Sequence, residues 1–186
     1  MAKVKLNPVL ERIRGKVGDL VFRRYEDQVV IAQKADQADH AATPGQAAHR
    51  ERFRLAALYG KAVIADPAAK AVYENAAHAR GKPVFALMVG DFLNAPVIEE
   101  IDLSAYTGRV DEPISIRASD DFEVADVKVA IRDTGGTALE QGTASPLNGT
   151  WRYTSKSALP AGQPVVIEVT ASDRPGNKTV KTQERS

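Results

Sequence analysis

Alternation of apolar and polar residues in the second half of the chain most constrains how it can fold. In three segments the apolar side chains recur at every second position, and the positions between them are mainly polar. The apolar positions are Ile114 and Ile116, then Val127, Val129 and Ile131, then Val165, Ile167, Val169 and Ala171. Because successive side chains of a strand point to opposite faces, this pattern predicts strands with one buried face and one wet face.

Other segments of this half complete an antiparallel β-sandwich. We also expect strands at residues 98–103, 137–142, 151–154 and 178–183. About seven short strands separated by turn residues are typical of two packed antiparallel sheets. We expect Trp151 to lie in the core between them.

The same half resembles bacterial immunoglobulin-like domains. The resemblance is carried by residues 118–124, 127–131, 151–153 and 171–177, the last of which read Ala-Ser-Asp-Arg-Pro-Gly-Asn. It implies an immunoglobulin-like sandwich over residues 96–186. It implies little about function, because such domains serve as spacers, adhesins and decorations on many proteins.

The first half has helical signals. Thr43-Pro44 and Asp66-Pro67 are cap-then-proline pairs that predict helices to about Ala65 and to Gly81, and an apolar helix is expected at residues 84–93. We expect Phe53, Tyr73 and Phe92 to form the core of a small helical cluster.

A β-hairpin is predicted ahead of these helices, from residues 19–25 and 28–33, with its loop at 26–27. Phe22 is expected opposite Ile31, with Leu20 and Val29 on the same face. Because both faces of the hairpin are apolar, it needs cover from its own helices or from another subunit, and the sequence leaves both open. We predict Leu20, Phe22, Val29 and Ile31 as interface residues.

Charge and composition divide the chain near Asn94 to Pro96. Residues 1–96 carry 15 Lys and Arg against 10 Asp and Glu, whereas residues 97–186 carry 10 against 14. The predicted class is therefore α+β, with a hairpin and helical docking region at 1–95 and an all-β sandwich at 96–186. The segments Gly15 to Gly18 and Gln46 to Phe53 resemble an uncharacterised bacterial hairpin-plus-helix family, which implies no known chemistry.

Two groups of charged residues are candidate binding sites. Asp120, Asp121, Asp173 and Asn177 could meet at one end of the sandwich and offer oxygen ligands to calcium, although the same residues are good turn formers. Arg23, Arg24, Arg50 and Arg54 could contact a nucleic-acid backbone, although acidic residues lie between them.

Motifs for catalysis are not found in the sequence. There is no cysteine, no Gly-x-Ser-x-Gly elbow, no phosphate-binding glycine loop and no histidine pair at metal-ligand spacing. We therefore expect no enzyme activity, no cofactor and no resident metal.

These observations predict a structural subunit of a repeated assembly, such as a phage-like particle, an injection apparatus or a filament. It would form a homo-oligomer or join a larger protein assembly, and nucleic-acid binding through the basic first half is the alternative. No apolar run approaches the roughly 20 residues of a membrane span, and the first residues lack the apolar core of a signal peptide. We therefore expect cytoplasmic synthesis, with release in a virion-like or extracellular assembly.

Overall fold

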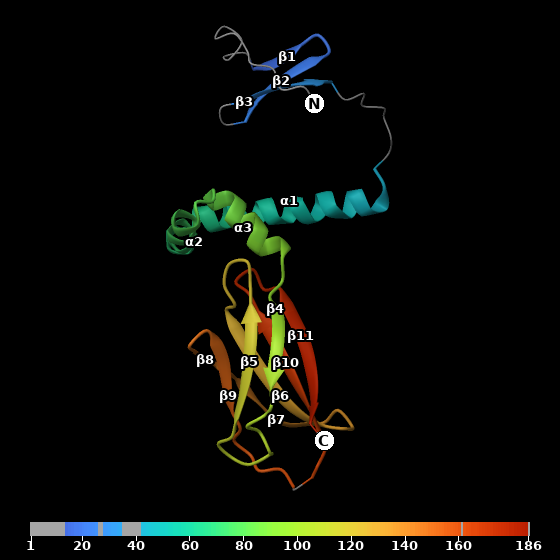
Figure 1. Cartoon of the computed structure of the whole chain (residues 1–186), viewed down its shortest axis with the longest axis vertical. Helices are drawn as coiled ribbons and strands as arrows, with labels where there is room; N and C mark the ends of the chain where they lie inside the picture. Colours follow the sequence, from blue (N-terminus) through green and yellow to red (C-terminus); the bar gives the residue numbers. More distant parts are fainter. Residues whose placement is uncertain (1–13, 26–27, 35–41, 161, 186) are drawn as a thin grey trace. The chain divides into compact units, whose positions relative to one another are not determined.

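A computed structural model of the chain describes residues 14–25, 28–34, 42–160 and 162–185. The chain divides into two compact units, Met1–Thr43 and Pro44–Ser186, and each is described by itself. Within the described ranges there are three helices and three antiparallel sheets (Figure 1). The predicted mixed α+β class is confirmed.

The first unit holds a three-stranded antiparallel sheet in the order β1-β2-β3. Its strands are β1 (Gly15–Val17), β2 (Leu20–Tyr25) and β3 (Gln28–Gln33). Phe22 pairs with Ile31, as predicted, and the loop at 26–27 lies outside the described residues. Strand β1 was not predicted. It turns back onto β2 at Gly18, whose φ of 59° lies in the left-handed region that favours glycine.

The second unit begins with three helices, α1 (Pro44–Ala65), α2 (Pro67–Arg80) and α3 (Val84–Leu93). Asp66 caps α2 by accepting hydrogen bonds from the backbone of Ala68 and Ala69, and Gly81 ends it in the left-handed conformation. Gly60 of α1 allows close approach of Phe85, whose ring would lie 2.8 Å from a Cβ atom at this position. All three helices were predicted within a few residues.

The expected helical core needs one correction. Tyr73 is buried and Phe92 is half-buried, but Phe53 is 50% exposed. Only one row of α1 is buried, and α1 is longer than the two helices that pack against it (Figure 1). That row is Ala56, Gly60 and Val63.

Two four-stranded antiparallel sheets follow and share one core. One sheet has the order β4 (Val97–Asp102), β5 (Pro113–Ser119), β9 (Thr150–Thr154) and β8 (Ser145–Leu147). The other has the order β11 (Lys178–Arg185), β10 (Val165–Ser172), β6 (Asp126–Asp133) and β7 (Ala138–Thr143). The alternating valines and isoleucines of both sheets form the buried cluster, and Trp151 packs against it half-buried.

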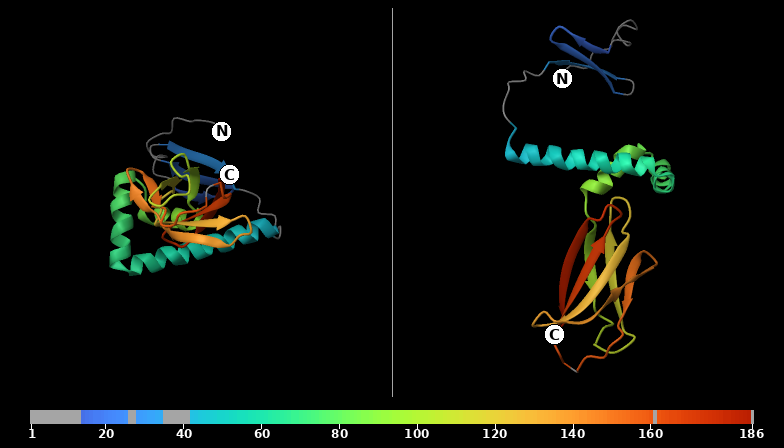
Figure 2. Two further views of the ribbon diagram at one scale, coloured as in Figure 1. Left: turned by 90° about the horizontal axis from the view of Figure 1, so that it is seen from below. Right: turned by 180° about the vertical axis from the view of Figure 1, so that it is seen from behind.

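The two sides of this β-sandwich are closed differently (Figure 2). On one side the chain passes from β7 into β8 through the buried Ala144, so a continuous segment leaves one sheet and joins the other. On the other side Lys181 of β11 donates hydrogen bonds to the carbonyls of Ile98 and Glu99 in β4, at 3.2 and 2.6 Å. The three-residue strand β8 is the one strand of the sandwich that was not predicted.

The helices contact one end of the sandwich. The Phe122 ring stacks on Tyr73 of α2 with ring centroids 4.3 Å apart. Arg80 of α2 donates to the backbone carbonyls of Asp121 and Phe122. Residues 44–186 form one compact unit. The predicted division after residue 95 falls inside this unit, between α3 and β4, and stays a prediction.

Candidate interaction surfaces

The sheet of the first unit presents apolar side chains that nothing in its described part buries. Leu20 is 45% exposed and Ile31 is 43% exposed, while Phe22 and Val29 are half-buried. The register places these four predicted interface residues on one face, because Phe22 pairs with Ile31 and the neighbouring pairs follow at every second position. The sequence therefore placed the four residues together correctly, and their role as an interface stays a prediction.

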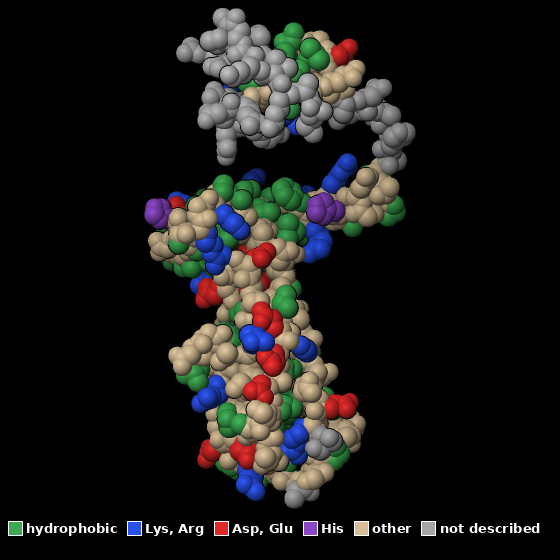
Figure 3. Space-filling view, viewed as in Figure 1, with side chains coloured by type: hydrophobic (Ala, Val, Ile, Leu, Met, Phe, Trp, Pro, Cys, Tyr) green, Lys and Arg blue, Asp and Glu red, His purple; other side chains and the backbone are tan. Residues whose placement is uncertain are grey.

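A second set of exposed apolar residues lies on α1 and was not predicted. It comprises Phe53, Leu55, Leu58 and Ile64, all at least 40% exposed. Figure 3 shows apolar side chains on the accessible surface of the helices. Of these residues, Phe53 was predicted to be buried, because a sequence pattern does not reveal how much of a long helix its neighbours cover.

The four arginines predicted for nucleic-acid contact belong to two different units. Arg23 is exposed on β2, and the side chain of Arg24 lies outside the described part. Arg50 and Arg54 are exposed on α1, where Nε and Nη2 of Arg54 donate to the Glu51 carboxylate at 2.8 and 2.6 Å. The charge of Arg54 is thus partly balanced by its own helix.

The four residues predicted for calcium do gather at the end of the sandwich that contacts α3. Asp120 accepts hydrogen bonds from the backbone N–H groups of Phe122 and Glu123, and Asp173 accepts them from Gly176 and Asn177. Asp121 accepts a hydrogen bond from the Asn94 side chain. No group of three or more described His, Asp or Glu side chains is arranged to hold a metal ion. These oxygens serve turns and a contact with the neighbouring helix.

Asn177 connects this loop to the end of α3. Its side-chain nitrogen lies 3.3 Å from the carbonyl oxygen of Asp91 and 3.2 Å from those of Phe92 and Asn94. It also lies 2.7 Å from Oδ2 of Asp173. The last carbonyls of a helix have no partner within the helix, so a donor at this position both caps α3 and fixes it to the sandwich.

Replacing Asn177 by alanine is expected to lower the free energy of unfolding by about 2 kcal/mol, because the carbonyls at the end of α3 lose their donor. Urea unfolding of the full chain, followed by circular dichroism, measures this. The matched control is Lys178→Ala, because Lys178 is the exposed next residue, at the start of β11. A loss no greater than that of the control would show that Asn177 does not fix the helix.

A buried carboxylate lies between the helices and the sandwich. Asp91 of α3 is fully buried, its Oδ2 accepts a hydrogen bond from the Tyr73 hydroxyl, and the Tyr73 and Tyr59 hydroxyls are 2.8 Å apart. Its Oδ1 has no hydrogen-bond partner within the described residues. Burial, and then the negative charges of Asp120 and Asp173, raise the pKa of Asp91 to about 6, against the lowering effect of Tyr73. The sequence feature that could have indicated this buried carboxylate is that Asp91 is the single acidic residue of the otherwise apolar segment 84–93.

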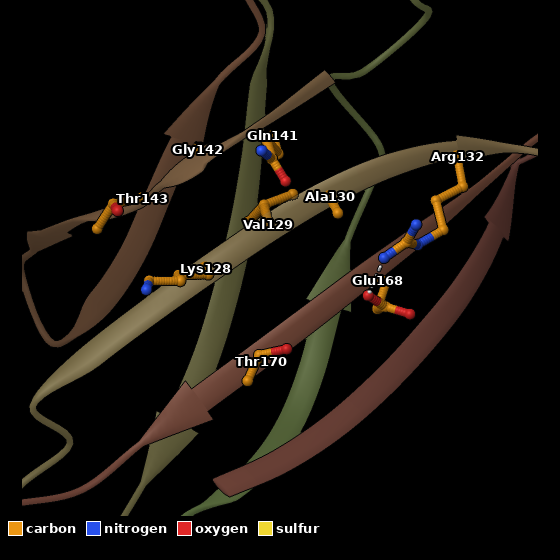
Figure 4. Close-up of a pocket in the computed structure, with 9 residues that line it drawn as sticks. All are labelled: Lys128, Val129, Ala130, Arg132, Gln141, Gly142, Thr143, Glu168 and Thr170. Carbon is orange, nitrogen blue, oxygen red and sulfur yellow. Dashed lines mark hydrogen bonds and ion pairs between the residues drawn. The ribbon is translucent and has the colours of Figure 1, made fainter. Parts of the chain in front are cut away.

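A shallow polar hollow lies on the outer face of the second sheet (Figure 4). Long side chains surround the small Ala130 of β6, and Arg132 bonds Glu168 of β10 across it at 2.8 Å. The predicted wet faces of β6 and β10 supply these residues. The charges of Arg132 and Glu168 are therefore paired with each other.

No protein-family model matches this sequence. No curated protein sequence matches it either. Among solved structures, the crystal structure of an engineered protein at 1.98 Å is similar to 48% of this chain, at 22% sequence identity and a TM-score of 0.33, and the match spans 19% of that protein.

Proposed function

We propose that the protein is a non-enzymatic subunit of a repeated assembly and that it docks through its N-terminal sheet. The observation that carries this proposal is the exposure of that sheet. None of its residues with a described side chain is buried, although apolar side chains occupy both of its faces. Apolar surfaces that their own compact unit does not cover are typical of sites that bind other proteins.

The N-terminal sheet is small. Its strands have three, six and six residues, too few to enclose a core between them. A sheet this small is marginal in water unless its apolar face packs against something. Cover by a neighbouring subunit would stabilise the sheet and join two copies at the same time.

The β-sandwich supplies the displayed part of the proposed subunit. Two antiparallel sheets around one core support an immunoglobulin-like fold for residues 96–186, as the resemblance implies. Domains of this kind act as spacers and decorations on larger structures. The proposed setting is a phage-like particle, an injection apparatus or a filament, with synthesis in the cytoplasm and release with the assembly.

No helix within the described ranges is both long enough and apolar enough to cross a membrane.

The test is the oligomeric state of the purified full chain. Light scattering and electron microscopy should show oligomers, and Phe22→Asp should dissolve them, because a charge would be buried in the docked face. The matched control is Val180→Asp, which makes the same kind of change at a side chain 57% exposed on β11 in the other unit. A native chain that stays monomeric at high concentration would overturn the proposal.

A further inference from the structure

Strand β3 differs from every other edge strand of the three described sheets. Its residues are Gln-Val-Val-Ile-Ala-Gln, without a charge or a proline. The other edges are protected: β1 carries Lys16, β4, β7 and β11 carry charged residues, and β8 has three residues with Pro146 in the middle. Charges, prolines and short strands are the usual means of preventing edge-to-edge pairing, and β3 has none of them.

The backbone direction of β3 shows which groups are available along its outer edge. The N–H of Lys34 donates to the carbonyl of Asp19 at 2.6 Å, which continues the pairing of β3 with β2. In an antiparallel pair, residues whose backbone N–H and C=O groups bond the neighbouring strand alternate with residues whose N–H and C=O groups point away from that strand. Val29, Ile31 and Gln33 therefore direct their N–H and C=O groups outward, and no described strand pairs with that edge.

We infer that β3 pairs antiparallel with β3 of a second copy of this chain, across a two-fold axis at Ile31. This inference rests on the proposed assembly function and names its contact. An uncharged strand is compatible with itself, because no like charges meet when two copies pair in opposite directions. Self-pairing of β1, β4, β7 or β11 would bring charged side chains together, and β8 is only three residues long with a central proline.

The register follows from the alternation. Outward residues can pair only with outward residues, so the axis must pass through a single residue, and the central choices are Val30, Ile31 and Ala32. An axis at Ile31 pairs Ile31 with itself and Val29 with Gln33, giving about six main-chain hydrogen bonds, whereas an axis at Val30 or Ala32 gives about four. It also keeps Phe22, Val29 and Ile31 of both copies on one face, so the two apolar faces become continuous.

A single-cysteine variant tests the pairing, because the chain has no cysteine of its own. In Ile31→Cys the two symmetry-related Cα atoms would be about 5.5 Å apart, within the range that a disulfide spans. The control is Leu20→Cys, which lies on the same face with 45% exposure against 43% for Ile31. Leu20 is on the central strand, so its two copies would lie three strand spacings apart across the sheet, about 14 Å, and four residues apart along it, about 13 Å, which is too far for a disulfide.

Under mild oxidation the Ile31→Cys chain should form a covalent dimer and the Leu20→Cys chain should stay single. Equal crosslinking of both variants would show face-to-face stacking and overturn edge pairing. A chain that light scattering shows to be oligomeric but that does not crosslink at position 31 would overturn only the edge pairing. A native chain that is monomeric would overturn the proposed function as well.

A second pair of variants tests the backbone itself. Ile31→Pro removes the outward N–H without touching a bond to β2, whereas Ile31→Ala removes a similar part of the side chain and keeps the N–H. Because two hydrogen bonds are lost per dimer, the dissociation constant of the Ile31→Pro dimer should be about 30-fold higher than that of the Ile31→Ala dimer. Equal dissociation of the two variants, with the circular dichroism of the native chain retained, would contradict the pairing.

Discussion

The Asp91→Asn chain is expected to be more stable than the native chain near neutral pH and to lose its pH dependence between about pH 4 and 7. Asp91 is fully buried, and its folded-state pKa is raised from 3.8 to about 6, first by burial. A difference of about two pKa units corresponds to about 3 kcal/mol between the two ends of this range. The native chain should therefore lose up to this amount as the pH rises.

The sign of this pH dependence follows from proton binding. The folded chain holds a proton on Asp91 at a pH where the unfolded chain has already released it. The resulting stabilisation is complete below the unfolded pKa of 3.8 and is lost as the pH rises through about 6. Asparagine does not ionise, its carbonyl can still accept from Tyr73, and its amide adds no negative charge beside Asp120 and Asp173.

Urea unfolding at a series of pH values between 4.5 and 7.5, followed by circular dichroism, measures the effect. Glu112 titrates below this range, because the Arg109 backbone N–H and then the Thr107 hydroxyl lower its pKa to about 2. The companion variant is Tyr73→Phe, which removes the hydrogen bond that lowers the pKa of Asp91, so the decline in stability should move to higher pH. A pH dependence that persists in Asp91→Asn would assign it to another group.

The strands were predictable because their signals are local. Alternation located β5, β6 and β10, and the length of the predicted loop fixed the pairing of Phe22 with Ile31. Strands β1 and β8 have three residues each, too short for a period of two to show. Their existence depends on a neighbouring strand that supplies the hydrogen bonds, which no local pattern contains.

The contact between the helices and the sandwich was only half predictable. That Asp120, Asp173 and Asn177 would gather followed from loops that share one end of a sandwich. The contact of these loops with α3 was missed because it depends on α3 lying against them, where the Asn177 side chain donates to the carbonyls of the helix end. Phe53 was misplaced for a related reason, since its exposure depends on where the shorter helices end.

Replacing Glu140 by alanine should destabilise the sandwich by about 3 kcal/mol, because the buried Tyr153 hydroxyl and two partly buried backbone N–H groups would lose their acceptor. Glu140 is 9% exposed on β7. Its Oε1 accepts from the Tyr153 hydroxyl at 2.5 Å and the Lys156 N–H at 2.7 Å, and its Oε2 accepts from the Ser157 N–H at 2.9 Å. Burial, and then the hydrogen bond with Glu140, raise the pKa of the Tyr153 hydroxyl. The hydroxyl therefore stays protonated and can donate.

Two comparisons separate this network from a general effect of losing a carboxylate. Glu168→Ala removes an acid that pairs with Arg132 at the partly exposed outer face of the same sheet, and it should cost about 0.5 kcal/mol. Tyr153→Phe removes one of the three hydrogen bonds and should cost about 1.5 kcal/mol. Urea unfolding followed by the fluorescence of Trp151, the single tryptophan, reports on the sandwich directly. If Glu140→Ala and Glu168→Ala lose the same stability, the buried acid does not hold the segment after β9 against β7, and the packing around Tyr153 must do so instead.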